Sequence, residues 1–339
     1  DNVSVKEVAG SHATQPTSTK RPIYARHPEG GIRNLLNYTE QFDNGYWSKG
    51  SSTSVSAGEV DPNGGSTAFK YNISTPTGRN VDTPDNVITS GKTYTFSLYV
   101  KAITNTIIRL RQSGNAAFDE DVSITTAQGW QRISLTFTAN SVLRVGFYDV
   151  SGSTGDRFYI WGAQLEEATE ASNYQKVVTD IDVTESGVGE VYYLKFDGVD
   201  DGMSINNLTS PNTPLTALFG YSATNANAFN GKFLVDILTG RTVFGASTDA
   251  VSQIGYFDGA WKDFNADSNA IKVLTYDLVE NDAKIRIDGT QEYSDTTYDQ
   301  KAIGGLIGLF ERYDSSGNFV AGNMYQTILR AAESTDEEI

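Results

Sequence analysis

The sequence predicts an all-β protein made of β-sandwiches. Short segments in which apolar and polar residues alternate recur along the chain, and this period of two is that of a half-buried strand. The 32 glycines, 18 tyrosines and 16 phenylalanines among 339 residues suit many short strands joined by tight turns. No repeat of about 20 to 50 residues recurs, which argues against solenoids and propellers. A chain of this length has room for two domains.

Composition and charge exclude several classes of function. A mean hydropathy of −0.36 with 38% hydrophobic residues describes a soluble chain that can form cores. The net charge of −16 would repel phosphate backbones, so nucleic acid is not an expected partner. No apolar run approaches the roughly 18 residues that span a bilayer, so no membrane insertion is expected. Because the first residue is Asp1 and not methionine, we expect a part of a longer polypeptide.

Residues 1–31 show little regular pattern. Val3, Val5 and Val8 suit one edge strand, and prolines prevent anything longer. The only histidines, His12 and His27, lie here and are predicted to be solvent-exposed loop residues, with a metal pair or a catalytic base as the alternative.

Clear strand patterns begin after this arm. Residues 91–101 combine a turn with a strand, in which one face carries Tyr94, Phe96, Leu98 and Val100. Comparable strands are predicted at residues 106–111, 129–137, 142–148 and 157–161. Five or more strands at this spacing predict a sandwich.

Residues 177–190 are polar and acidic with two glycines, and they are predicted to be a linker. Beyond it, Asp197-Gly198 is predicted to turn a hairpin between residues 192–197 and 203–205. A second hairpin is predicted around residues 278–282, and Asp288-Gly289 is a further turn. Other strands are predicted at residues 215–222, 233–238, 241–246 and 304–310.

The segment Phe196-Asp197-Gly198-Val199-Asp200-Asp201 resembles the opening hairpin of concanavalin A-like lectin domains of the laminin-G type, which are common in bacteriophage virion proteins. Residues 10–15 and 20–24 resemble the segment that directly precedes this hairpin in the family, although residues 25–191 separate the two here. Residues 325–330 and 334–339 resemble the closing strand and the start of the terminal helix.

The intervening region carries a second resemblance. Residues 34–43 with 46–47, and the ending at residues 162–167 with Tyr174, resemble jelly-roll carbohydrate-binding modules of phage and bacterial surface proteins. Together the resemblances imply two jelly-roll sandwiches, one inserted into the other: an N-terminal arm at 1–31, a jelly roll at 32–176, a linker at 177–190 and a lectin-like sandwich at 191–339. Insertion is tolerated where the ends of a surface loop lie close together.

The residue inventory argues against an enzyme, and no catalytic residues are predicted. The sequence lacks the residues for a nucleophilic triad, because there is no cysteine and both histidines lie in the arm. The nearest approach to paired carboxylates is Asp277, Glu280 and Asp282, which fall at a predicted hairpin tip.

Sugar binding requires aromatic rings beside polar groups, because sugars present apolar C–H faces and hydroxyls. Loop aromatics with acidic or amide neighbours are therefore the candidates for carbohydrate binding. They are Tyr46 with Trp47, and Tyr256, Phe257 and Asp258 with Trp261. For Trp47 a place in the core is an equal alternative, whereas Trp130 and Trp161 are predicted to be core residues in strands.

Calcium is the one cofactor considered, as a structural ion, because it takes oxygen ligands from tight acidic loops. The candidate ligands are Asp61 and Asn63 in one loop, and Asp197, Asp200 and Asp201 in another. The alternative at both places is that these residues form turns and cap backbone amides.

The resemblances imply a non-enzymatic phage virion appendage, of the tail or head fibre or spike type, that binds host cell-surface polysaccharide. Its expected location is the extracellular particle, with other virion proteins as partners and a homo-oligomer, usually a trimer in a fibre, as its state. The first alternative is a purely structural capsid or tail decoration protein without sugar binding. The second is a polysaccharide depolymerase.

Overall fold

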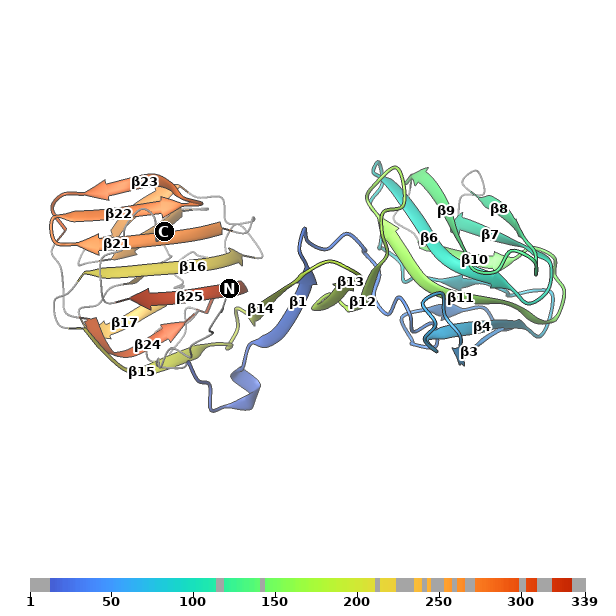
Figure 1. Ribbon diagram of the computed structural model, residues 1–339, viewed down its shortest axis with the longest axis horizontal. Helices are drawn as coiled ribbons and strands as arrows, with labels where there is room; N and C mark the ends of the chain where they lie inside the picture. The colour runs from blue at the N-terminus through green and yellow to red at the C-terminus, as the bar shows by residue number, and fades with distance from the viewer. Residues whose placement is uncertain are drawn as a thin grey trace, which may run out of the picture. The chain divides into compact units, whose positions relative to one another are not determined.

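The computed structural model describes residues 13–113, 119–140, 144–210, 214–223, 235–239, 243–244, 253–257, 261–265, 272–298, 303–309 and 319–330. Within these ranges the only helix is the three-residue 3₁₀ helix Ser18–Lys20, and all other regular structure is β-strand (Figure 1). The prediction of an all-β fold is therefore confirmed. The predicted edge strand at Val3, Val5 and Val8 lies outside the described residues, as does His12.

The chain divides into two compact units. One consists of residues 1–25 and 192–339, and we call it the discontinuous unit; the other, residues 26–191, we call the continuous unit. Two strands, β1 (Ile23–Pro28) and β14 (Glu190–Asp197), each cross one of the boundaries between these segments.

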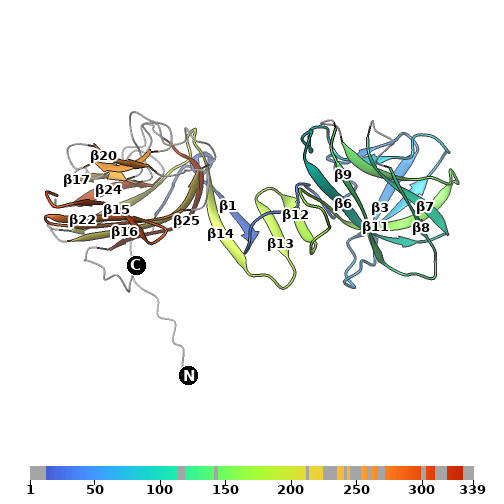
Figure 2. The ribbon, with the colours of Figure 1, turned by 90° about the horizontal axis from the view of Figure 1, so that it is seen from above.

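The continuous unit contains two five-stranded sheets (Figures 1 and 2). The first, which we call the β6 sheet, has the order β3 (Thr53–Glu59), β4 (Ala68–Ile73), β11 (Gly155–Glu166), β6 (Thr93–Ala102) and β9 (Gln131–Thr138). The second, the β7 sheet, has the order β2 (Ser48–Lys49), β5 (Val81–Asp82), β10 (Val145–Asp149), β7 (Thr106–Gln112) and β8 (Glu120–Ile124). The five strands predicted for this region are confirmed as β6, β7, β9, β10 and β11, with shifted ends.

The core of this unit follows from the predicted alternation. In β6 and β9 the register places Phe96 opposite Leu135 and Leu98 opposite Ile133, all of them buried. Elsewhere in the same sheet, Tyr71 of β4 stacks on Phe158 of β11 with ring centroids 4.4 Å apart. These large apolar side chains share one cluster with residues of the β7 sheet, which makes the unit a sandwich.

Residues 175–185 form a hairpin where an irregular linker was expected. Strand β12 (Gln175–Thr179) pairs antiparallel with β13 (Asp182–Glu185), and β13 pairs parallel with β1 at Arg26 and Asp182. Val177 and Val183 lie opposite each other and are buried. The polar and glycine-containing composition that suggested a linker belongs largely to the turns at residues 180–181 and 186–189.

The discontinuous unit also contains two sheets. In the first, six strands follow the order β14, β25 (Ala321–Arg330), β16 (Leu215–Ala223), β21 (Lys272–Val279), β22 (Asp282–Ile287) and β23 (Thr290–Asp295). In the second, the order is β15 (Met203–Ser210), β24 (Ile303–Leu309), β17 (Val235–Thr239), β18 (Val243–Phe244), β19 (Gln253–Phe257) and β20 (Trp261–Asn265). The core cluster takes buried residues from both sheets, among them Phe219 and Ile307.

The predicted hairpin at Asp197-Gly198 is wrong, because its two strands belong to different sheets. Strand β14 pairs with β25, whereas β15 pairs with β24. The carboxylate of Asp197 accepts hydrogen bonds from the amides of residues 199, 200 and 201 and so folds a corner. The hairpin predicted around residues 278–282 is confirmed as the β21–β22 pair.

The N-terminal arm hydrogen-bonds to the start of β15 and to the residue just before it. Thr14 and Ser204 exchange backbone hydrogen bonds of 2.8 and 2.9 Å, and the amide of Gly202 donates to the carbonyl of Lys20. The side chain of Gln15 donates to the carbonyl of Gly202 at 2.9 Å. The arm therefore belongs to the discontinuous unit.

Candidate functional site

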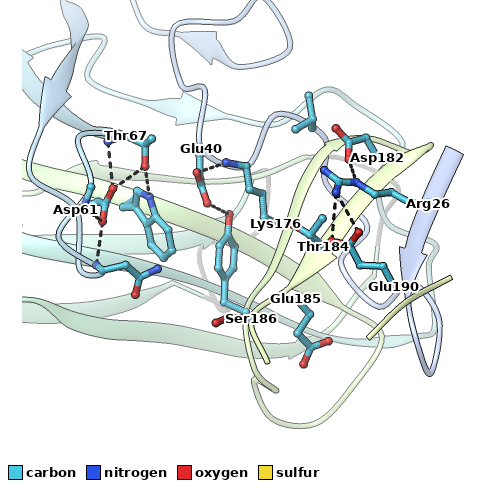
Figure 3. Close-up of a pocket in the computed structure, with 15 residues that line it drawn as sticks. Arg26, Glu40, Asp61, Thr67, Lys176, Asp182, Thr184, Glu185, Ser186 and Glu190 are labelled. Atoms are coloured by element: carbon cyan, nitrogen blue, oxygen red, sulfur yellow. Dashed lines mark hydrogen bonds and ion pairs between the residues drawn. The ribbon is translucent and has the colours of Figure 1, made fainter. Parts of the chain in front are cut away.

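The continuous unit carries a cleft of about 720 Å³ between the loop at residues 61–67 and the β12–β13 hairpin (Figure 3). A smaller hollow of about 300 Å³ shares Asn63, Trp161, Tyr174 and Ser186 with it and adds Tyr99. The two hollows therefore form one continuous candidate site.

Three aromatic rings form one wall of this site. Trp161 comes from β11, Tyr99 from β6, and Tyr174 from the loop before β12. The ring centroid of Trp161 lies 4.7 Å from that of Tyr174 and 5.3 Å from that of Tyr99. A bulge in β11 follows Trp161, and Gly162 there has φ +61°. A Cβ at Gly162 would lie 3.2 Å from Tyr99 and 3.3 Å from Tyr174, so glycine lets the rings approach each other.

The loop at residues 61–67 folds around the carboxylate of Asp61. One oxygen accepts from the amides of Asn63 and Gly65, and the other accepts from the amide and the hydroxyl of Thr67. Burial raises the pKa of Asp61, but these four hydrogen bonds together lower it further, so its pKa falls below the usual value. The Trp161 indole in turn donates to the Thr67 hydroxyl at 2.8 Å, which ties the loop to the aromatic wall.

The opposite side of the cleft is organised by Glu40. Its carboxylate accepts from the Lys176 ammonium at 2.8 Å and from the Tyr174 hydroxyl at 3.3 Å (Figure 3). Burial, with the nearby charge of Glu40 as the next cause, raises the pKa of Tyr174 well above its usual value. The phenol therefore remains protonated and serves as a hydrogen-bond donor.

The hairpin side adds further charged groups. The Arg26 guanidinium lies between Asp182, at 2.7 Å, and Glu190, at 3.1 Å (Figure 3). Glu185 accepts from Arg33 at 2.8 Å. Five carboxylates line the cleft against the cations of Arg26 and Lys176, so its lining is acidic.

The first predicted sugar platform lies mainly in the core. Trp47 is 1% exposed, its indole donates to the carbonyl of Tyr38 at 3.0 Å, and its ring packs 4.9 Å from that of Phe42. Tyr46 is half-buried and meets Trp47 edge to face. A ring without an open face cannot stack on a sugar, so this placement favours the core alternative for Trp47.

The second predicted platform falls on β19 and β20. These strands pair antiparallel, with Phe257 opposite Trp261 and Tyr256 opposite Lys262. Asp258 lies outside the described residues. Sugar binding by Tyr256, Phe257, Asp258 and Trp261 stays a prediction.

The two predicted calcium loops differ in how their carboxylates are used. Both oxygens of Asp61 already accept hydrogen bonds within their own loop, and Asn63 is exposed, an arrangement that suits a turn cap better than an ion site. The carboxylates of Asp197, Asp200 and Asp201 lie within 4.8 Å of one another. Asp197 caps three amides, and Asp201 accepts from the amide of Asp197. Calcium binding at this corner stays a prediction.

The structure places three further residues for which the sequence made a prediction. Trp161 lies in a strand and is 4% exposed, as predicted, although the cleft reaches its edge. Trp130 is not a core strand residue: it lies in a half-buried bend before β9, after Gly129 with φ +67°. His27 is not an exposed loop residue, because it lies in β1 and is 6% exposed, with Nδ1 2.8 Å from the carbonyl oxygen of Pro28.

Sequence reasoning missed Tyr99, Tyr174 and Glu40 as site residues. The alternation in residues 93–101 already separated Tyr99 from the buried face of its strand, and that was the available signal. Tyr174 and Glu40 lie in loops far apart in sequence, and only the folded chain brings them together.

Neither a family model nor a curated protein matches this chain. Among solved structures, it is similar to the N-terminal tandem of CBM22 domains of Xyn10C from Paenibacillus barcinonensis, with 9% identity, 93% of this chain and 100% of that chain covered, and a TM-score of 0.32. It is also similar to domains LG4-5 of the mouse laminin α1 chain, with 10% identity, coverage of 75% and 87%, and a TM-score of 0.29. At these identities and scores the likenesses carry no conclusion about function.

The fold and the cleft define an all-β protein of two units, each with two packed sheets, and with an aromatic-walled acidic cleft in the continuous unit. Among the described residues, no helix has the length and apolar character that crossing a membrane requires.

Proposed function

We propose that the continuous unit binds a polysaccharide chain in this cleft without cleaving it. The observation that carries the proposal is the group of three aromatic rings, Trp161, Tyr174 and Tyr99, at one polar cleft. Aromatic rings accept the apolar faces of sugars, and a few fixed polar groups then select the hydroxyls.

The charges of the cleft favour neutral sugars. The lining carboxylates other than Asp61 can accept hydrogen bonds from sugar hydroxyls, whereas an anionic sugar would be repelled by all five. The Lys176 ammonium supplies donors on the same side, because Glu40 takes only one of its three hydrogens. Neutral hexose or pentose polymers are therefore the ligand class that this cleft suits best.

The state of the carboxylates supports binding over cleavage. A glycosidase needs two carboxyl groups that flank one bond at about 5 to 10 Å, usually with one held protonated. Here Glu40, Asp61 and Glu185 each already accept hydrogen bonds from neighbouring side chains. Asp182 and Glu190 share the Arg26 guanidinium. Each of these carboxylates is already bonded within the chain, so none is left free to flank a glycosidic bond as the depolymerase alternative requires.

The wider role that we propose is that of a phage virion appendage that attaches to host surface glycans. Support for it is the resemblance of residues 196–201 and their distant companion segments to virion lectin domains. Location in the extracellular particle, contacts with other virion proteins and a homo-oligomeric state belong to the same proposal.

A glycan array followed by calorimetric titration of the best ligand tests the binding proposal. We expect Tyr99→Ala to weaken binding about tenfold, because it removes one ring of the wall. Tyr159→Ala is the matched control. Tyr159 is a half-buried tyrosine in neighbouring β11, and its ring packs near Trp130 and not at the cleft. Trp161 is unsuited to this test, because it is buried and bonded to Thr67.

Equal loss in both variants would indicate a general effect on folding. Unchanged affinity in Tyr99→Ala would place the ligand elsewhere. If wild-type protein retained no glycan from host or plant polysaccharides, the purely structural alternative would replace this proposal.

A further inference from the structure

A second polar site lies on the β7 sheet, around the ring of Tyr148. Arg109 and Arg111 alternate along β7 with Ile108 and Leu110, which are fully buried, so the two arginines project from the face opposite the core. Tyr148 stands opposite Arg109 on the neighbouring strand β10. Three guanidinium carbons approach its ring centroid, those of Arg111 at 5.3 Å, Arg79 at 5.6 Å and Arg109 at 5.8 Å.

Two of these arginines have carboxylate partners. Arg109 donates to both oxygens of Asp121, at 2.6 and 2.7 Å, and to the Tyr148 hydroxyl at 3.2 Å, and its Nη1 also lies 3.4 Å from an oxygen of Asp119. Arg111 donates through Nη2 to Asp82, which is 2% exposed. Gly146 makes room for this pair, because a Cβ there would lie 2.1 Å from an oxygen of Asp82. These ion pairs hold Arg109, Arg111 and the ring of Tyr148 in fixed positions.

Arg79 differs from the other two. It lies in the loop between β4 and β5, and within the described part of the chain it has no carboxylate partner. Its Nη1 is buried and has no hydrogen-bond acceptor there, and the same holds for Nε of Arg111. Because Arg79 is only partly buried and has no carboxylate of its own among the described residues, an anion from outside the chain can pair with the exposed part of its guanidinium.

We infer that the Tyr148 face binds the carboxylate of an acidic sugar, a uronic or sialic acid. The planar guanidinium fork matches a carboxylate, and an aromatic ring flanked by arginines can support the sugar ring beside it. Tyr148, Arg79, Arg109 and Arg111 are all partly exposed, so a sugar can reach them. This site lies on a different sheet from the aromatic wall of the acidic cleft, and the inference does not rest on the function proposed there.

The test compares acids with their esters. Oligosaccharides of galacturonic, glucuronic and sialic acid are titrated into the full chain beside the same compounds as carboxyl methyl esters, which keep the ring and lose the charge. We expect at least one acid to bind, its ester to bind about tenfold more weakly or worse, and the affinity of the acid to fall as salt rises.

Variants then assign the site. Arg79→Gln should lower the affinity for the acid about tenfold. Arg79→Lys should recover part of that affinity, because lysine restores the charge without the planar guanidinium. Arg144→Gln is the control, since it removes the same charge from a guanidinium that is paired with Asp85 at 2.9 Å and not grouped at Tyr148. Tyr99→Ala should leave acid binding unchanged, which separates this site from the cleft.

Three results would overturn the inference. The first is equal affinity for the acid and its ester. The second is an affinity for the acid that neither Arg79→Gln nor Arg144→Gln changes. The third is failure of every acid to bind. Melting curves of each variant show that a loss of binding is not a loss of fold.

Discussion

A single carboxylate sets the conformation of the loop that borders the cleft. Asp61 is 5% exposed, and it accepts four hydrogen bonds from residues two to six positions further along the chain. Thr67 then receives the indole hydrogen of Trp161. The loop, the aromatic wall and the cleft therefore depend on one side chain.

This dependence predicts a pH effect. The folded-state pKa of Asp61 lies below its usual value of 3.8, so its contribution to stability is fully present above about pH 4 and is lost as the pH falls through the folded pKa. We expect Asp61→Ala to lower the free energy of unfolding by about 1 to 3 kcal/mol at pH 7, and the difference from wild type to shrink below about pH 4. Urea unfolding at a series of pH values measures it. Asp43→Ala, at an exposed position, is the control, and a pH-independent gap would contradict the prediction.

Residue types predicted the roles of some side chains better than those of others. The turn-cap alternative for Asp61 followed from its own loop, because its acceptors and donors are close in sequence. Trp47 and Trp161 could not be distinguished in the same way. Both are nearly buried, but only Trp161 borders a cleft, and that difference depends on Tyr174 and on the loop at residues 61–67.

Among the strands and their connections, the Asp197 corner passes the chain from one sheet of the discontinuous unit to the other. Gly198 has φ +73°, and a Cβ there would lie 2.7 Å from the backbone nitrogen of Ala321. Glycine is thus required for two reasons, the left-handed backbone and the close approach of β25. Alternation predicted the strands on both sides, but not that they pair with β25 and β24, because those partners lie about a hundred residues or more later in the chain.

Substitutions can separate the effect of the positive φ at Gly198 from the effect of the close approach of β25. Gly198→Ala should lower the free energy of unfolding by about 2 to 4 kcal/mol, since it adds a clash to the cost of the positive φ. Gly289→Ala is the matched control, because Gly289 has φ +80° but no atom within 4 Å of the point where a Cβ would lie, and it should cost only about 1 kcal/mol. Chemical denaturation of both variants measures the difference, and equal losses would show that β25 yields to the added methyl group.

At the scale of the whole chain, the discontinuous unit combines the N-terminal residues 1–25 with the C-terminal residues 192–339. The arm contributes a backbone bridge at Thr14 and Ser204 and further hydrogen bonds at Gly202. Composition and periodicity showed nothing of this, because the arm has little pattern of its own. Only the resemblance of residues 10–15 and 20–24 to the segment that directly precedes the Phe-Asp-Gly-Val-Asp-Asp hairpin in lectin-like domains suggested it, and the nested arrangement of domains stays a prediction.

Excision of the continuous unit tests that arrangement. The rings of Tyr24 and Tyr192 stack with centroids 5.6 Å apart, so the two points at which the chain leaves the discontinuous unit are adjacent. A short glycine–serine linker in place of residues 26–191 should therefore leave this unit able to fold, because a loop that closes adjacent ends costs little entropy.

We expect the excised chain to unfold cooperatively in urea, as followed by circular dichroism, and residues 26–191 alone to do the same. Removing residues 13–22 from the excised chain is the control. It deletes the hydrogen bonds of Thr14, Gln15 and Lys20 and should cost about 2 to 4 kcal/mol. If the excised chain stayed unfolded while residues 26–191 folded, the discontinuous unit would depend on the continuous one and would not be a domain into which another has been inserted. If removal of the arm had no effect, the arm would be an appendage and not a part of the sandwich.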